Sequence, residues 1–274
     1  MVVFPNAKIN IGLNILRKRE DGYHELETLF YPIGWKDALE YVANGGNRIN
    51  FVSSGLDLDI DPEQNIVVKA YRLLQAEYTL PGLDIHLHKV IPAGAGLGGG
   101  SADAAFFLKS LNDHFELGIS LEKLKLLAGK LGADCPFFIE NQVAYATGIG
   151  ELLEPVEIHL KGNYLLLVKP PVEIQTKAAY QDVVPMAYPF DFRAILRGDK
   201  QEWKGKIKND FEPSLFAKFP LLEGIKHHFY QMGGWYAAMS GSGSAVYGFF
   251  DHPPIFNSEE FPPDSFIWQE ELSI

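Results

Sequence analysis

The sequence of 274 residues predicts an α+β protein, and three patterns lead to this prediction. Apolar and polar residues alternate in short runs through the first 60 residues, as they do in half-buried strands. Residues 63–78 then change to helical spacing, and a helical pattern returns at residues 104–115. From about residue 160 strand-like and helix-like segments occur again. We therefore expect two lobes of mixed structure.

The first lobe is expected to contain strands, helices and one hairpin before about residue 155. Its strands are predicted at residues 7–16, 28–35, 37–42, 48–54 and 83–91. Its helices are predicted at 63–78, from Ser101 to Asp103 onward, and at 120–132, where Gly132 ends the last of them. A hairpin is predicted at 142–156. The pattern restarts near Pro155, so we divide the chain into domains 1–155 and 156–274.

The second lobe has fewer sequence signals. Residues 162–171, "GNYLLLVKPP", are typical of a strand that two prolines end. Residues 223–232 favour a helix, and two strand-like halves in 235–250 flank the small-residue loop "SGSGSA". The tail after Asp251 has no motif, and we expect it only to complete the fold.

Composition and charge exclude several classes of function. A net charge of -11 argues against a broad grip on nucleic acid or an anionic membrane, which requires a basic surface. The single cysteine, Cys135, excludes an internal disulfide framework and a multi-cysteine metal site. The first residues lack the pattern of a secretory signal or transit peptide, and no apolar run is long enough to span a membrane. We expect a cytoplasmic protein.

The segment "IPAGAGLGGGSADAA" at residues 91–105 contains the strongest motif. Gly94, Gly96 and Gly99 fit the G-x-G-x-x-G pattern of a dinucleotide-binding turn. However, Pro92 breaks the preceding strand, and the acidic residue about 20 positions on, Glu116, lies at the end of a predicted helix. A P-loop is also disfavoured, because Gly100 stands where that motif needs a lysine. A dinucleotide-dependent oxidoreductase is therefore a minor alternative.

The glycines and the helix after them favour phosphate as the ligand. Glycine lets the backbone approach a ligand closely, and the start of a helix presents free N–H groups and the positive end of its dipole. The alternative is a glycine-rich turn that binds nothing.

The same loop resembles the P-x-x-x-G-L-G-S-S-A nucleotide loop of the GHMP kinases. Further segments resemble the same family in the same order, from about residue 4 to 250, including "PNAKINIGLNI", "DGYHELETLF", "LGADCPFFI", "NDFEPSLF" and "SGSGSAVYGFF". The resemblance implies a two-lobed α+β fold, with an N-terminal lobe like domain 2 of ribosomal protein S5 and a C-terminal ferredoxin-like lobe. It implies an ATP-binding domain at 1–155 and a substrate domain at 156–274.

The resemblance also implies a catalytic pair. Asp134 in "GADCPFF" matches the family's catalytic aspartate, and Lys8 matches the lysine beside it. The two would act as a base and an electrostatic partner in phosphoryl transfer. By residue type alone, Asp134 is more often a cap or turn residue and Lys8 more often a surface position on a strand.

A branch of the family that phosphorylates the 2-hydroxyl of a cytidine-diphosphate-linked polyol is the best match, because "GYH" would recognise a base. The implied substrate-binding residues are Asn10, Tyr23, His24, Phe30, Thr176, Tyr180, Gly241, Ser242 and Gly243. His24 would hydrogen-bond the cytosine, and the aromatic rings would stack on it, with Tyr180 on the other face. Without the resemblance, Tyr23 and His24 would be surface residues and Gly241 to Gly243 a flexible turn.

ATP with Mg²⁺ is the implied cofactor, because the β and γ phosphates must be neutralised for transfer. The implied ATP-binding residues are Pro92, Ala93, Gly94, Ala95, Gly96, Leu97, Gly98, Gly99, Gly100, Ser101 and Asn65. Asn65 is also a candidate N-cap. We expect no protein cage for the metal, although Ser101 is placed to contact phosphate or metal.

Other polar residues are given structural interpretations. Cys135 is expected to be a buried, inert thiol, and the alternating pair His86 and His88 a solvated strand face. Two other functions stay open: a GHMP kinase acting on a different small alcohol, and a nucleotide-binding regulator without catalysis.

Overall fold

The computed structural model describes residues 1–57, 60–188 and 190–274, and its helices and strands form two compact units. One unit contains Met1–Lys8, Gly34–Ala93 and Gly98–Gln142, and the other contains Ile9–Ile33, Gly94–Leu97 and Val143–Ile274. Both units mix helices with sheets, so the α+β prediction is confirmed. No helix in the described ranges is long and apolar enough to cross a membrane.

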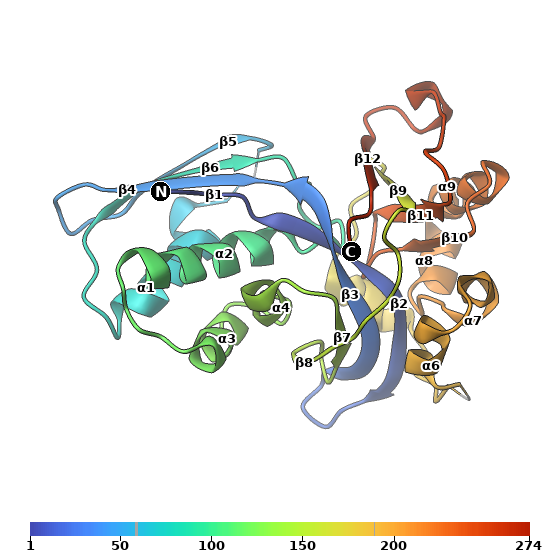
Figure 1. The fold of residues 1–274 in the computed structure, drawn as a ribbon, viewed down its shortest axis with the longest axis horizontal. Helices are drawn as coiled ribbons and strands as arrows, with labels where there is room; N and C mark the ends of the chain where they lie inside the picture. The colour runs from blue at the N-terminus through green and yellow to red at the C-terminus, as the bar shows by residue number, and fades with distance from the viewer. Residues whose placement is uncertain (58–59, 189) are drawn as a thin grey trace. The chain divides into compact units, whose positions relative to one another are not determined.

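A sheet in the order β1-β4-β6-β5 forms one layer of the first unit (Figure 1). Its strands are β1 (Val2–Val3), β4 (Ala38–Ala43), β5 (Asn50–Gly55) and β6 (Leu83–Lys89). Strand β6 pairs antiparallel with β4 and parallel with β5. Burial alternates strictly along β6, which explains why its sequence alternates. The strand ends at Lys89, directly before the glycine-rich segment.

Helices cover one face of this sheet (Figure 1). They are α1 (Ile66–Gln75), α2 (Gly99–His114), α3 (Leu121–Gly129) and α4 (Cys135–Glu140), with a short 3₁₀ helix at Pro62–Gln64 before α1. Asn65 caps α1 by accepting a bond from the Val67 amide at 2.9 Å. Ser120 caps α3 in the same way. Helices α1 and α2 pack against each other, so the glycine-rich start of α2 is held by a buried helix pair.

The second unit is built on two sheets. One has the order β2-β3-β7-β8 and contains β2 (Asn6–Lys18), β3 (His24–Lys36), β7 (Ala144–Thr147) and β8 (Leu152–Pro155). The other is antiparallel in the order β10-β11-β9-β12 and contains β9 (Tyr164–Lys169), β10 (Tyr236–Met239), β11 (Val246–Phe250) and β12 (Phe266–Glu271). The first residues of β2 and the last of β3 belong to the other unit.

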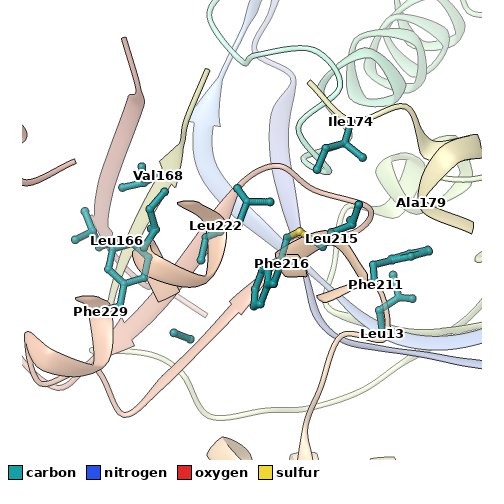
Figure 2. Close-up of a cluster of buried hydrophobic side chains, with 14 of the residues drawn as sticks. Leu13, Leu166, Val168, Ile174, Ala179, Phe211, Leu215, Phe216, Leu222 and Phe229 are labelled. Carbon is teal, nitrogen blue, oxygen red and sulfur yellow. The ribbon is translucent and has the colours of Figure 1, made fainter. Parts of the chain in front are cut away.

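The helices of the second unit are α5 (Thr176–Ala179), α6 (Phe192–Arg197), α7 (Trp203–Lys206), α8 (Glu212–Lys218) and α9 (Pro220–Gln231), with 3₁₀ helices at Tyr180–Asp182, Lys200–Glu202 and Ser258–Glu260. Figure 2 shows part of the core that they form: Phe229 of α9 lies by Leu166 and Val168 of β9, with Leu215 of α8 in the same cluster. This core fixes the ends of β10 and β11, and therefore the short loop between them.

The structure differs from the sequence prediction in several elements. Strand β1 and helices α5 to α8 were not predicted. Helix α2 begins at Gly99 and not at Ser101 or later. Helix α4 was not predicted. It has Pro136 in its first turn, where proline is well tolerated. The tail contains β12, which pairs with β9 over Phe266–Glu271.

Candidate active site

Lys8 and Asp134 lie together in the first unit. Nζ of Lys8 is 3.3 Å from Oδ2 of Asp134, and the exposed fractions of the two side chains are 4% and 34%. Asp134 stands at the start of α4, but its side chain makes no capping hydrogen bond. The surface interpretation of Lys8 is therefore wrong. Asp134 does occupy a turn and the N-cap position of α4, as its residue type suggests, but its side chain contacts Lys8. The arrangement is an accessible carboxylate beside a buried cation.

The start of α2 lies next to this pair. Gly98 has a φ of 69°, and a side chain there would meet Phe138 at 2.9 Å and Cε of Lys8 at 3.2 Å. Only glycine fits without strain, because the left-handed backbone and the lack of space act together. The N–H groups of the first turn, from Gly99 to Ser101, have no partner within the helix. The helix start near Lys8 is thus suited to bind an anion.

The other glycines, Gly94 and Gly96, belong to the second unit, where Ala95 and Gly96 contact the "SGSGSA" loop. The Ala245 amide donates to the Ala95 carbonyl at 3.1 Å, and Oγ of Ser240 donates to the Gly96 carbonyl at 2.8 Å. A side chain on Gly241 would begin 3.1 Å from Oδ1 of Asn10. The structure therefore brings together Asn10 and Gly241, which the sequence assigned to the substrate, and Gly96, which it assigned to ATP.

Asn10 and Thr176 are each held by a hydroxyl group. Nδ2 of Asn10 donates to Oγ1 of Thr28 at 3.0 Å, and that hydroxyl donates to the Gly12 carbonyl. Oγ1 of Thr176 lies 3.1 Å from Oγ of Ser242. Sequence reasoning missed Thr28 and Ser240, because a hydroxyl residue on a strand or in a loop carries no signal of its partners. The hydroxyl of Thr176 is therefore in contact with the small-residue loop.

His24 and Tyr180 form an aromatic group of the second unit. Their rings stack with centroids 4.9 Å apart and planes 18° apart, and Tyr180 packs edge-on against Phe211. Burial, followed by the positive charge of Lys18, lowers the pKa of His24 from its ordinary value. A neutral imidazole can accept as well as donate a hydrogen bond. Tyr23 is 61% exposed beside this group, whereas Phe30 is buried in β3.

Asn65 lies at a pocket of about 290 Å³ in the first unit. The other residues that line this pocket are Phe51, Ser53, Asp57, Ile60, Asp61 and Pro62. The side chain of Asn65 caps α1, so the capping interpretation is confirmed. The pocket beside it is large enough for the ring system of a small ligand.

A buried ion network lies behind the start of α2. Nζ of Lys89 pairs with Asp37 and lies 2.8 Å from Oδ2 of Asp103. Oδ1 of Asp37 accepts bonds from the amides of Val90 and Ile91 at 2.6 and 2.8 Å. Burial raises the pKa of Asp103 to about 8, against the attraction of Lys89. The network ties the end of β6 to α2 on either side of the glycine-rich segment.

The remaining polar candidates match their structural interpretations. Burial raises the pKa of the Cys135 thiol to about 11, so the thiol is inert at neutral pH. His86 and His88 are exposed on β6, and each lies within hydrogen-bond distance of Oγ of Ser54. The described ranges contain no cluster of three His, Cys, Asp or Glu residues that would hold a metal ion.

Comparisons with known proteins identify the family of this chain. The model of the GHMP kinases N terminal domain matches residues 65–142, and that of the GHMP kinases C terminal matches residues 191–255. The chain belongs to the GHMP kinases.

The relatives narrow the family further. A 4-diphosphocytidyl-2-C-methyl-D-erythritol kinase of Parabacteroides distasonis is 50% identical over 273 residues, covering 100% of both chains. The protein of the same name from Bacteroides fragilis is 50% identical over 99% of this chain and 100% of its own. A crystal structure of 4-(cytidine 5'-diphospho)-2C-methyl-D-erythritol kinase covers 92% of this chain and 91% of its own at 33% identity, with a TM-score of 0.80. Within the GHMP kinases, the chain belongs to the 4-diphosphocytidyl-2-C-methyl-D-erythritol kinases.

Proposed function

We propose that this chain transfers the γ-phosphate of ATP to the 2-hydroxyl of 4-diphosphocytidyl-2-C-methyl-D-erythritol, giving the 2-phosphate and ADP in the non-mevalonate pathway to isoprenoid precursors. The contact between Lys8 and Asp134 carries the proposal, because it pairs an accessible base with a fixed cation. The identity of the relatives over the whole chain supports the choice of substrate.

In the proposed reaction, Asp134 accepts the proton of the 2-hydroxyl as its oxygen attacks the γ-phosphorus. The new O–P bond forms while the bond to the leaving ADP breaks. Lys8 stabilises the negative charge that develops on the attacking oxygen. Because Lys8 is buried and paired in the ground state, little reorganisation is needed when that charge appears.

ATP is proposed to bind through backbone groups of residues 92–101 and through the pocket at Asn65. The free N–H groups at the start of α2 would contact phosphate oxygens, and the pocket of about 290 Å³ would take the adenine. Mg²⁺ would enter with the phosphates and supply charge neutralisation. The hydroxyl of Ser101, in the first turn of α2, is the hard oxygen donor that fits it, with ATP and water as the other ligands.

The substrate is proposed to bind through residues of the second unit. His24, with Tyr23 and Tyr180, would recognise the cytosine, and Phe30, which is buried in β3, would line the same pocket. Because His24 and Tyr180 are in stacking contact, Tyr180 must move away if the base is to lie between the two rings. Asn10, Thr176 and Gly241 to Gly243 would contact the polyol and diphosphate. We retain 1–155 and 156–274 as the proposed ATP-binding and substrate domains, and the cytoplasm as the proposed compartment.

A GHMP kinase for a different small alcohol would not need the aromatic group at His24 and Tyr180. A regulator without catalysis would not need the pair of Lys8 and Asp134. Analysis of the product by ³¹P NMR tests the proposal. A new phosphate monoester on the 2-oxygen, formed together with ADP, is expected. Formation of ADP alone, or of a monoester at another position, would contradict it.

A further inference from the structure

The segment "NDFEP", residues 209–213, has no role in the proposed chemistry, yet Asn209 lies behind the small-residue loop of the second unit. Its side chain is 1% exposed. Nδ2 donates to the carbonyls of Met239 and Gly241, both at 2.8 Å, and Oδ1 accepts from the Phe211 amide at 3.0 Å. Both N–H groups and the oxygen of the amide are therefore used.

Glu212 binds the backbone N–H of Met239, the residue whose carbonyl accepts from Asn209. Its Oε1 accepts from the Met239 amide at 2.8 Å, while Oε2 pairs with Nζ of Lys226 at 2.6 Å. Met239 is thus fixed through its N–H by Glu212 and through its carbonyl by Asn209. This fixes the backbone at the end of β10, from which the loop starts.

Ser240, which follows Met239, contacts two other residues of the proposed site, Asn10 and Gly96. Its Oγ accepts from the Asn10 amide at 3.1 Å and donates to the Gly96 carbonyl at 2.8 Å. The Ser240 amide in turn donates to the Ala245 carbonyl at 2.8 Å, which closes the loop. The position of Ser240 therefore sets both Gly96 and Asn10, and Asn209 holds the residues on either side of Ser240.

We propose that Asn209 is a positioning residue, whose amide fixes residues 239–241 so that the small-residue loop, Gly96 and Asn10 are arranged to bind the phosphorylated ligands. This inference rests on the proposed function. Asparagine is specifically required, because one nitrogen must donate to two carbonyls. Aspartate has the same shape, but as a carboxylate it would direct an oxygen at both carbonyls.

The test compares Asn209→Ala and Asn209→Asp with Asn163→Ala as a matched control. Asn163 is also buried in the second unit, but among the described residues its side-chain amide contacts the Leu160 carbonyl and Nζ of Lys200 and no part of the small-residue loop. Both alanine variants are expected to lower the Tm. Only Asn209→Ala is expected to lower kcat/KM for the cytidyl substrate, by roughly 10- to 100-fold, because small misplacements of binding groups have effects of that size. Asn209→Asp is expected to be at least as impaired.

Amide hydrogen exchange gives a readout that does not depend on turnover. Exchange at residues 240–245 is expected to be faster in Asn209→Ala than in Asn163→Ala. Equal exchange and equal kcat/KM in these two variants, or wild-type kinetics in Asn209→Asp, would overturn the role of Asn209. If Asn209→Ala does not fold, Asn209→Asp and Ser240→Ala decide: wild-type kinetics in both contradict the inference, and impaired kinetics in both support it. Lack of turnover by the wild-type chain would instead contradict the proposed function, and exchange would still test Asn209.

Discussion

Nζ of the buried Lys8 lies 3.3 Å from Oδ2 of Asp134, although the two residues are far apart in the sequence and lie on a strand and at a helix start. A buried lysine is costly unless it is paired, so this contact is a constraint on the fold as well as a feature of the site. It directs one carboxylate oxygen toward the cation and leaves the side chain partly accessible.

Asp134→Asn is expected to lower kcat by roughly 100-fold or more, because it removes the proposed general base while keeping the shape of the side chain. ATP should still bind, since its proposed contacts are with residues 92–101 and the pocket at Asn65 and do not include Asp134. Steady-state kinetics combined with an ATP titration measure both effects. Lys125→Met is a suitable control, because it breaks the partly exposed ion pair with Glu140, and it should leave kcat unchanged. Nearly full activity of Asp134→Asn would rule out the base assignment.

His24→Ala is expected to raise the KM for the cytidyl substrate by about 10-fold, with little change in the KM for ATP. The variant loses both a hydrogen bond to the base and the stacking contact with Tyr180. Tyr180→Phe, which keeps the ring, should stay close to wild type. His86→Ala removes an exposed histidine of β6 and serves as the control. The assignment fails if His24→Ala changes the two KM values equally.

Gly98→Ala is expected to lower kcat as well as stability, and by more than the strain of a left-handed φ at alanine would cause. The left-handed φ costs about 1 kcal/mol for alanine, and the added methyl group would press on Phe138 and Lys8. Gly118→Ala carries the same backbone cost, with a φ of 67° and no atom within 4 Å, so it separates the two effects. Thermal melting and kcat are measured for both variants. Equal loss of stability with equal kcat would show that the contact with Lys8 is unimportant.

The buried Asp103 predicts a dependence of stability on pH. Burial raises its folded pKa to about 8, above its unfolded value, so the protonated form is favoured in the folded state. Its contribution to stability is therefore complete below the unfolded pKa and is lost as the pH rises through 8. Asp103→Asn does not titrate. As the pH rises from 6 to 9, the free energy of unfolding of the wild type should fall relative to that of the variant, by on the order of 2 kcal/mol. Parallel pH profiles would contradict the prediction.

The regular elements were largely predictable from the sequence, because alternation and helical spacing report which residues face the core. Helix α4, the short helices α5 to α8 and the strand β12 were not predicted, since none of them has a long enough pattern. Individual site residues were predicted only through resemblance to a family. Residue type alone gave the wrong interpretation of Lys8, because burial by distant residues decides whether a lysine on a strand is exposed.

The hydrogen-bond partners of site residues were beyond sequence reasoning. Asn209 binds carbonyls of residues 239 and 241, and backbone carbonyls have no sequence signature. Likewise, the contact of Ser240 with Gly96 joins loops that are 144 positions apart. Long-range contacts of this kind depend on the complete fold and not on local pattern.

The specificity constant, measured by coupled ADP release, tests the proposed choice of substrate. Wild-type protein with ATP and Mg²⁺ is assayed with 4-diphosphocytidyl-2-C-methyl-D-erythritol and, in parallel, with homoserine, mevalonate and galactose. We predict kcat/KM at least 1,000-fold higher for the cytidyl substrate, about the discrimination expected of a site that both hydrogen-bonds and stacks on a base. No turnover of that substrate, or better turnover of another alcohol, would contradict the proposed function.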